Sequence, residues 1–414
     1  MVDKSTRFLL IMMAFSPLLG FILRGIYDTR IAVLTFFGNA FVLIFIALWL
    51  SKGWSKIKFP AYALPLLLLS VYVGAWDFFN GNVAERGVEI VLFRNYHFFS
   101  LVTLLIIENS TFSKKFIKRI VFLLTITIIP AILVSMIQAT FDPFFFTPES
   151  YFTENAASIG NMYEMRPPSI FAYLGFNDVA LSFIPILSLV LGYRMRYNYD
   201  KLVTGVLMFL GGLVCFATNA RYAMINFVTV ISQVLVGKRM NIKKILLYVL
   251  VCILGLIVIL LVLQYIGYDL GMYLQERLLD TSANTRLMAF SLIYKYLPQH
   301  PIFGTGVRVG EDLYWEIQYI SSQIHVGYLS LLYEYGIVGG ILTYWVWYLL
   351  FKDLRNVARM TKFYASLFGF VTFLLANAAL VQYDIYLYGI VYLFVFSKHF
   401  KDEHELAKVK APTV

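Results

Sequence analysis

Charged residues are scarce in this chain of 414 residues. Only 14% of the residues are Asp, Glu, Lys or Arg, whereas 60% are hydrophobic; soluble domains average about 25% charged and roughly 45–50% apolar. A membrane span needs roughly 20 apolar residues, so twelve spans would use about 240 residues and leave about 174 for connections and tails. The composition therefore predicts a membrane protein and excludes a large soluble domain.

Cysteine is almost absent. Cys215 and Cys252 are the only two, and each lies inside an apolar run. This excludes a disulfide framework and a cysteine-based metal site. The chain also lacks an internal repeat between its halves, whereas transporters commonly show one.

Long uncharged runs are abundant. Five are long enough to cross a bilayer by themselves, namely 31–50, 120–141, 202–219, 245–268 and 363–383. Shorter or interrupted runs fill the gaps at 8–23, 61–76, 88–107, 179–193, 222–236, 325–351 and 385–397. We therefore expect an all-α polytopic membrane protein, with residues 1–414 forming a single membrane domain of about twelve transmembrane helices.

The basic residues predict an orientation. With the N-terminus inside, every short lysine-rich connection falls on the cytoplasmic side, which then carries 24 of the 34 basic residues and 7 of the 24 acidic ones. This is the positive-inside pattern, so the formal charge of +10 reports topology and not nucleic-acid binding. The same topology predicts a cytoplasmic tail at 398–414 and two long extracytoplasmic loops, at 142–176 and 266–324.

Arginine dominates the basic residues on the predicted outer side. Lys295 is the one lysine there, beside Arg24, Arg30, Arg86, Arg94, Arg166, Arg221, Arg277, Arg286 and Arg308. The planar guanidinium suits phosphate oxygens and stays charged when partly desolvated. An extracytoplasmic diphosphate ligand would explain this bias; ordinary salt bridges with the outer acidic residues are the alternative for any single arginine.

Arg221 stands out among these arginines. It lies in a very short outer turn, 217–223, between two apolar runs, so its guanidinium is expected at the membrane boundary. Ionisable residues in such positions are functional by default. The alternative is an arginine that snorkels to the lipid headgroups.

His325 is the histidine with the strongest claim to a chemical role. It stands at the outer start of a predicted span, and imidazole transfers protons readily near neutral pH. A purely structural histidine at a helix end is the alternative. Glu334 lies about half a helical revolution away from His325, so we expect it to satisfy polar groups between helices, beside close-packing glycines at Gly336, Gly339 and Gly340.

Three ordered motifs resemble the O-antigen ligase and polymerase superfamily of bacterial inner-membrane glycosyltransferases. They are RLMAF from Arg286, HPIFGTG from His300, and HVGYLSLLYEYGIVG from His325. They are similar to the family's loop arginine, its "hP-x-x-G-x-G" turn and its "H-N-x-Y-L-x-x-L-x-E-x-G-x-x-G" helix. Arg166 with the RPPSIFA segment, and Arg221, match two further family positions. Val326 departs from the pattern, because the family commonly has Asn there.

The resemblance implies a GT-C-like fold in the bacterial inner membrane with an active site that faces the periplasm. It implies an undecaprenyl-diphosphate-linked glycan as donor, membrane lipid as surroundings, inversion at C1, no cofactor and no metal. The acceptor would be a second lipid-linked glycan for a polymerase or lipid A-core for a ligase. A chain-length regulator protein is a further partner of such systems, and no nucleic-acid partner is implied.

Roles follow for the individual residues. His325 and Arg221 are the expected catalytic residues, acting on the acceptor hydroxyl and the diphosphate respectively. Arg166, Arg286, Arg277 and Arg308 are expected to bind the diphosphate or its sugar. The outer side has no acidic or histidine cluster with metal-ligand spacing, which predicts a metal-independent reaction. A polymerase is favoured over a ligase because the outer loops are rich in aromatic residues that suit sugar stacking. A lipid-linked glycan flippase or transporter is the rival of another class.

Overall fold

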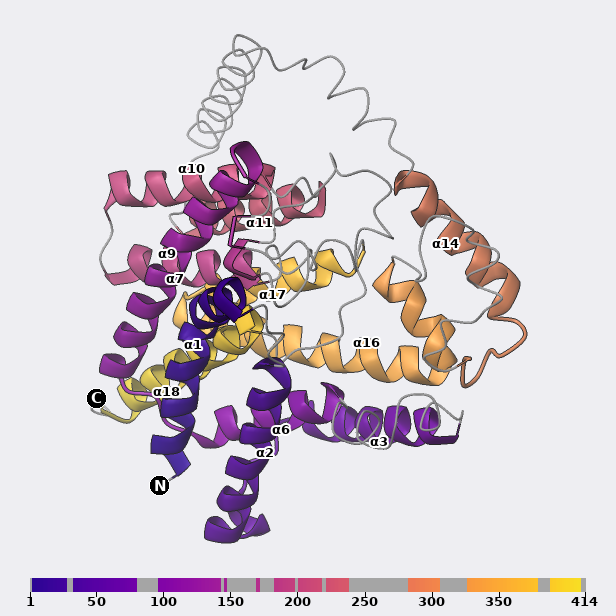
Figure 1. Ribbon diagram of the computed structural model, residues 1–414. Helices are drawn as coiled ribbons and strands as arrows, with labels where there is room; N and C mark the ends of the chain where they lie inside the picture. The colour runs from indigo at the N-terminus through magenta and orange to yellow at the C-terminus, as the bar shows by residue number, and fades with distance from the viewer. Residues whose placement is uncertain are drawn as a thin grey trace.

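The computed structural model describes residues 2–27, 33–79, 96–142, 145–146, 169–171, 182–197, 200–217, 221–237, 282–305, 326–378 and 388–410. Over these residues the secondary structure is entirely helical, as predicted. The N-terminal part contains α1 (Val2–Tyr27), α2 (Val33–Lys52), η1 (Trp54–Lys56), α3 (Ala63–Phe79), α6 (Tyr96–Asn109) and α7 (Lys114–Thr140). The remainder contains η3 (Ser169–Phe171), α9 (Ile184–Tyr197), α10 (Lys201–Ala217), α11 (Arg221–Gly237), α14 (Ser282–Tyr296), α16 (Gly327–Thr361), α17 (Ala365–Ala376) and α18 (Tyr388–Lys410) (Figure 1).

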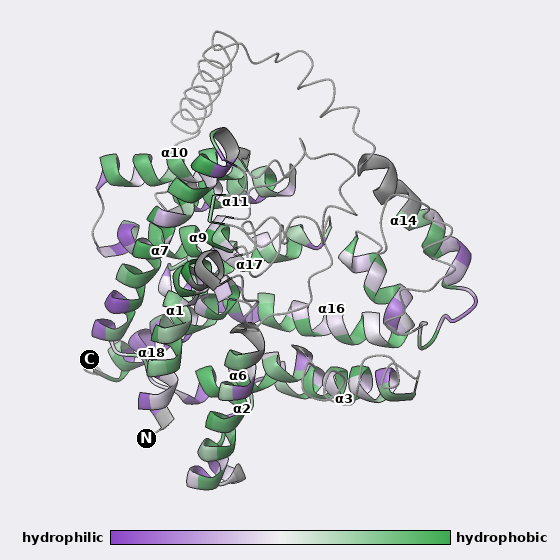
Figure 2. Cartoon of the chain, in the orientation of Figure 1, coloured by the Kyte–Doolittle hydropathy of each residue, from purple (hydrophilic) through white to green (hydrophobic). Residues whose placement is uncertain are grey.

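Several helices have the composition of membrane spans. Among the described residues, Asp3–Ile22, Lys114–Gln138 and Gly327–Thr361 are long and apolar enough to cross a bilayer, and shorter apolar helices accompany them. Figure 2 shows hydrophobic residues along most of these helices. The predicted span 245–268 lies outside the described residues, so the total of about twelve spans stays a prediction.

The core joins the two ends of the chain. Tyr388 and Tyr392 on α18 are fully buried, and their hydroxyls donate hydrogen bonds to the carbonyls of Ala14 (2.9 Å) and Leu10 (2.7 Å) on α1. A hydroxyl away from water needs such a partner. The first and last described helices are therefore held together by apolar contact and by these hydrogen bonds.

Helices α9, α11 and α17 pack against one another, and polar contacts join them at one level. Arg196 donates to the Thr361 carbonyl (2.6 Å), while Ser188, two turns earlier on α9, donates to the carbonyl of Ala365 (3.0 Å). The chain from the end of α16 to the start of α17 therefore runs in the opposite direction to α9. The Ser188 hydroxyl proton is shared between the Ala365 carbonyl and Oε1 of Gln233 on α11, and the Gln233 amide donates to the Ser188 carbonyl (2.9 Å). The same level of the bundle thus contains Ser188, Gln233 and Ala365.

Helix α16 is broken, whereas the sequence predicted one span at 325–351. Gly336 has φ 60° and ψ −164°, values that no helix contains. We call residues 327–335 the short arm and residues 337–361 the long arm. Figure 1 shows the two arms meeting at a sharp angle. The short arm folds back far enough that a Cβ atom on Gly340 would meet Leu332 at 2.6 Å.

A charged cluster lies where α6, α16 and α18 come together. We use that name for Glu108, Asp353, Lys398, Lys401 and Asp402. Lys398 pairs with Asp402 at 2.6 Å, and Lys401 pairs with Glu108 at 3.5 Å. All five residues belong to segments predicted to end on the cytoplasmic side.

Candidate functional site

The sequence motif that begins at His300 forms a turn that fits into the break of α16. Main-chain hydrogen bonds join the turn to both arms: Thr305 N–H to Tyr333 O (2.9 Å), Ile337 N–H to Pro301 O (2.9 Å) and Val338 N–H to Ile302 O (3.2 Å). The first N–H groups of a helix have no partner inside that helix. Carbonyl groups of the turn therefore cap the start of the long arm.

Two glycines make this fit possible. Gly304 (φ +74°) and Gly336 (φ +60°) both adopt backbone conformations that disfavour other residues. A Cβ atom on Gly304 would lie 2.5 Å from the Gly336 nitrogen, and a Cβ atom on Gly336 would lie 2.5 Å from the Gly304 nitrogen. The second and third sequence motifs thus meet backbone against backbone.

The short arm is also fixed at its other end. The Gly327 N–H donates to the carbonyl of Asn377 just after α17 (2.8 Å), and the Tyr328 hydroxyl donates to the Leu374 carbonyl (2.7 Å). Val326 is the N-cap residue of α16 and makes no side-chain cap. His325 immediately precedes Val326 and lies outside the described residues.

Helix α14 brings Arg286 to the same arm. Ala289, Leu292 and Ile293 of α14 form a small buried cluster with Val326 and Tyr333. Ala289 follows Arg286 by one turn. The backbone that carries Arg286 and the backbone that follows His325 are therefore packed together.

The helix register relates Arg221 to this region. Arg221 is the first residue of α11 and precedes Gln233 by twelve residues, about 18 Å of helix. Asn377 follows Ala365 by the same number of residues along α17. Gln233 and Ala365 share one level, and the predicted topology has α11 and α17 run in opposite directions, so we expect the start of α11 and the end of α17 at a common level. We use the name junction for the start of α11, the end of α17, α14, the 300–305 turn and the short arm.

The motif residues Glu334 and Gly339 lie on either side of the break. Glu334 Oε1 accepts a hydrogen bond from Ser330 Oγ (2.8 Å), one turn earlier on its own arm. A Cβ atom on Gly339 would clash with Tyr335 of the short arm and approach Tyr72 of α3 at 3.1 Å. Gly339 thus occupies a close-packed position, whereas Gly336 provides the break itself.

The structure does not describe the side chains of the remaining predicted site residues. Arg166, Arg277, Arg308 and His325 lie outside the described residues, and for Arg221 and Arg286 the structure describes the helix backbone only. Their chemical roles stay predictions. The part of the chain that the structure describes contains no group of three acidic, histidine or cysteine side chains that could hold a metal.

Tyr72 is a residue of the junction that sequence reasoning missed. It lies within an ordinary apolar run in α3, yet its hydroxyl lies 3.0 Å from the Phe303 carbonyl and 2.8 Å from the Tyr335 carbonyl. No motif marks it. For the docking of the turn on α16, the available sequence signal was the presence of Gly304 and Gly336, because each belongs to a motif that resembles the family's.

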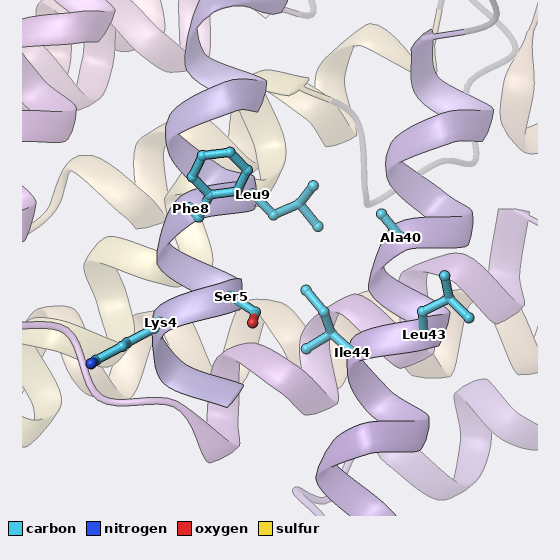
Figure 3. Close-up of a pocket in the computed structure, with 7 residues that line it drawn as sticks. All are labelled: Lys4, Ser5, Phe8, Leu9, Ala40, Leu43 and Ile44. Atoms are coloured by element: carbon cyan, nitrogen blue, oxygen red, sulfur yellow. The ribbon is translucent and has the colours of Figure 1, made fainter. Parts of the chain in front are cut away.

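Two apolar grooves differ in their relation to the junction. One lies between α1 and α2 and is shown in Figure 3; it is lined by Lys4, Ser5, Phe8, Leu9, Ala40, Leu43 and Ile44. The other begins at the short arm; it is lined by Tyr328, Tyr344, Trp347, Tyr348, Phe351 and Leu374. The first contains none of the predicted site residues, whereas the second adjoins the junction.

A family model described as O-antigen ligase matches residues 206–344. The match confirms the resemblance to the O-antigen ligase and polymerase superfamily, and it includes α11, α14, the 300–305 turn and the break in α16. Together with the apolar helices, the match supports a bacterial membrane protein that is similar, over part of its length, to a family of glycosyltransferase-like enzymes. No protein of curated function matches the sequence.

Proposed function

We propose that this protein polymerises undecaprenyl-diphosphate-linked oligosaccharide repeat units at the outer face of the bacterial inner membrane. The observation that carries the proposal is the junction, where α14, the helix of Arg286, packs on the backbone that follows His325. Arg221, at the start of α11, is expected at the same level of the bundle. A GT-C-like bundle of about twelve spans would supply the scaffold.

The arginines suit the charge that develops in such a reaction. When the bond between C1 and the phosphate breaks, negative charge grows on the departing diphosphate, and fixed cations stabilise that charge. Arg221 begins α11, so its guanidinium would act beside the positive end of the helix dipole. Arg286, Arg166, Arg277 and Arg308 would bind the diphosphate or the adjoining sugar.

His325 would act on the acceptor. As a base or orienting group, its imidazole would receive or align the proton of the attacking hydroxyl, so that attack opposite the diphosphate inverts C1. The proposal needs no metal. The apolar groove from Tyr328 to Phe351 offers an apolar surface for the polyprenyl chain of the donor, next to the arm that follows His325.

The nearest alternative is a ligase, which would transfer the glycan to lipid A-core. The family match supports both activities, and the polymerase is favoured by the aromatic residues of the predicted outer loops. A flippase is less suitable because the predicted arginines gather at one boundary, whereas transporters tend to bind near the midplane.

Incubation with defined lipids separates these functions. The purified protein in nanodiscs would receive lipid-diphosphate-linked repeat units with or without lipid A-core. A ladder of products from repeat units alone is expected. Transfer that occurs only to lipid A-core would establish a ligase, and translocation without any new glycosidic bond would establish a flippase.

The orientation has a separate test. Cysteines would replace exposed Ser291 of α14 and exposed Lys115 of α7 in a protein that lacks Cys215 and Cys252. A membrane-impermeant thiol reagent should label position 291 from the periplasmic side and position 115 from the cytoplasmic side only. Labelling of position 115 from the periplasm would refute the proposed topology.

A further inference from the structure

The hydroxyl of Tyr72 lies between the two backbones that dock at the junction. The carbonyls of Phe303, in the turn, and Tyr335, in the short arm, are 3.0 Å and 2.8 Å from it. A phenol has one proton to donate, so this proton is shared between a turn and an arm that are 32 residues apart in sequence. The Tyr72 ring also packs against both side chains, with centroid distances of 6.4 Å to Phe303 and 6.5 Å to Tyr335.

Tyr72 comes from a part of the chain outside the family match. Helix α3 packs along α16, and Trp76, one turn after Tyr72, contacts the Phe303 ring at 5.4 Å. The docking of two matched segments against each other is therefore completed by an unmatched helix.

The docked turn fixes both ends of the segment 306–325. Thr305, just before this segment, is bound to Tyr333 of the short arm, and Val326, just after it, begins that arm. Tyr333 follows Val326 by seven residues, about 10 Å along a helix. A residue that holds the turn against the short arm therefore also fixes the two attachment points of the segment that contains Arg308 and His325.

We propose that Tyr72 is a positioning residue for the transfer reaction. Its hydroxyl holds the 300–305 turn in the break of α16, and in this way it fixes the attachment points of the segment that contains His325. This inference rests on the proposed function. It adds a residue of the N-terminal helices, outside the family match, to the proposed active site.

The test compares Tyr72→Phe with the matched variant Tyr392→Phe. Both substitutions remove one tyrosine hydroxyl that donates to a main-chain carbonyl, and Tyr392 lies in the α1–α18 contact instead. Hydrogen–deuterium exchange, measured without substrate, reports the amides of 302–305 and 336–338. Steady-state kinetics with a lipid-diphosphate-linked repeat unit then report kcat and KM.

In Tyr72→Phe we expect exchange at 302–305 and 336–338 to become about five- to ten-fold faster, as loss of one hydrogen bond would produce. Turnover should fall about ten-fold with donor KM within about two-fold, because displaced groups affect the transition state more than binding. Tyr392→Phe should change neither quantity at the junction.

Three results would overturn the inference. They are unchanged exchange in Tyr72→Phe, faster exchange with wild-type kcat, and the same local exchange and kcat changes in Tyr392→Phe. A wild-type protein that transfers no sugar would instead overturn the proposed function. The exchange measurement by itself decides whether Tyr72 holds the turn.

Discussion

The charged cluster is held together by side chains, whereas the junction is held together mainly by main-chain groups. In the charged cluster, side chains make the contacts, as in the pairs Lys398–Asp402 (2.6 Å) and Lys401–Glu108 (3.5 Å). At the junction, main-chain groups of the 300–305 turn bond directly to main-chain groups of α16, around Gly304 and Gly336. One region depends on which side chains are present, and the other depends on two side chains being absent.

This difference predicts different tolerance to substitution. Long charged side chains can rearrange, and partly exposed ion pairs contribute little net free energy. Two backbones in contact have no such freedom, because any Cβ atom must displace main-chain atoms. The junction should therefore be the more sensitive region, and a change there should alter both folding and chemistry.

Gly336→Ala should have the largest effect. The added methyl group must enter the space of the Gly304 backbone, and the alanine must adopt a positive φ. We therefore expect destabilisation by about 3 kcal/mol or more and little folded protein. Gly53→Ala is the matched control, because Gly53 has φ +71° but no atom within 4 Å of the added Cβ. Thermal unfolding in detergent measures both. Equal losses in the two variants would contradict the tight docking.

His325→Ala should lower turnover by about 10²–10⁴-fold, the usual range for loss of a proton-transferring group. Donor affinity should change little, because the arginines are expected to bind the diphosphate. His404→Ala, in the predicted cytoplasmic tail, is the control and should be fully active. A folded His325→Ala protein with near-native turnover would remove His325 from the mechanism, and loss of wild-type activity in EDTA would contradict metal independence.

Arg221→Ala should lower turnover by roughly 10²–10³-fold, as expected for loss of an electrostatic stabiliser. Arg221→Lys should restore little activity because the planar fork of donors is lost. Arg119→Ala, an exposed arginine predicted on the cytoplasmic side, serves as the control. Kinetics at equal protein level test this, and a fully active Arg221→Ala variant would refute the contact with the diphosphate.

The charged cluster should give the smallest effect. Burial lowers the pKa of Lys401, but the carboxylates of Glu108 and Asp353 outweigh burial and leave that pKa above its ordinary value. Lys401 therefore stays charged at neutral pH. A double-mutant cycle with Lys401→Met and Glu108→Gln should nevertheless give a coupling free energy of only about 1 kcal/mol or less. A coupling of several kcal/mol would show that the charged cluster is as sensitive to substitution as the junction.

The helices were largely predictable from sequence, because a long uncharged run has few other solutions in a membrane protein. Helices α2, α7, α10 and α11 follow such runs closely. The break in α16 was not predictable, since Gly336 fits a close-packed helix as well as it fits a positive φ. Its docking partner Gly304 is 32 residues away, and only the folded backbone brings the two together.

The site was predictable in part for a similar reason. A minimal turn between two apolar runs predicted that Arg221 lies at the membrane boundary next to a span, and α11 begins at Arg221. Local sequence contained no sign that α14 would pack on the short arm or that Tyr72 would bridge the turn and α16. Such contacts depend on tertiary packing, which a motif does not encode.

The docking of both ends of segment 306–325 on one short arm also bears on how glycan specificity can diverge. Because the attachment points are about 10 Å apart along one helix, the loop-closure cost changes only slowly with the length of the segment. Insertions or exchanges between Thr305 and Val326 would leave the hydrogen bonds of Thr305 and Gly327 in place. Under the proposed function, related proteins could therefore change the length and sequence of segment 306–325, and with it their sugar preference, while the short arm and the membrane bundle stay the same.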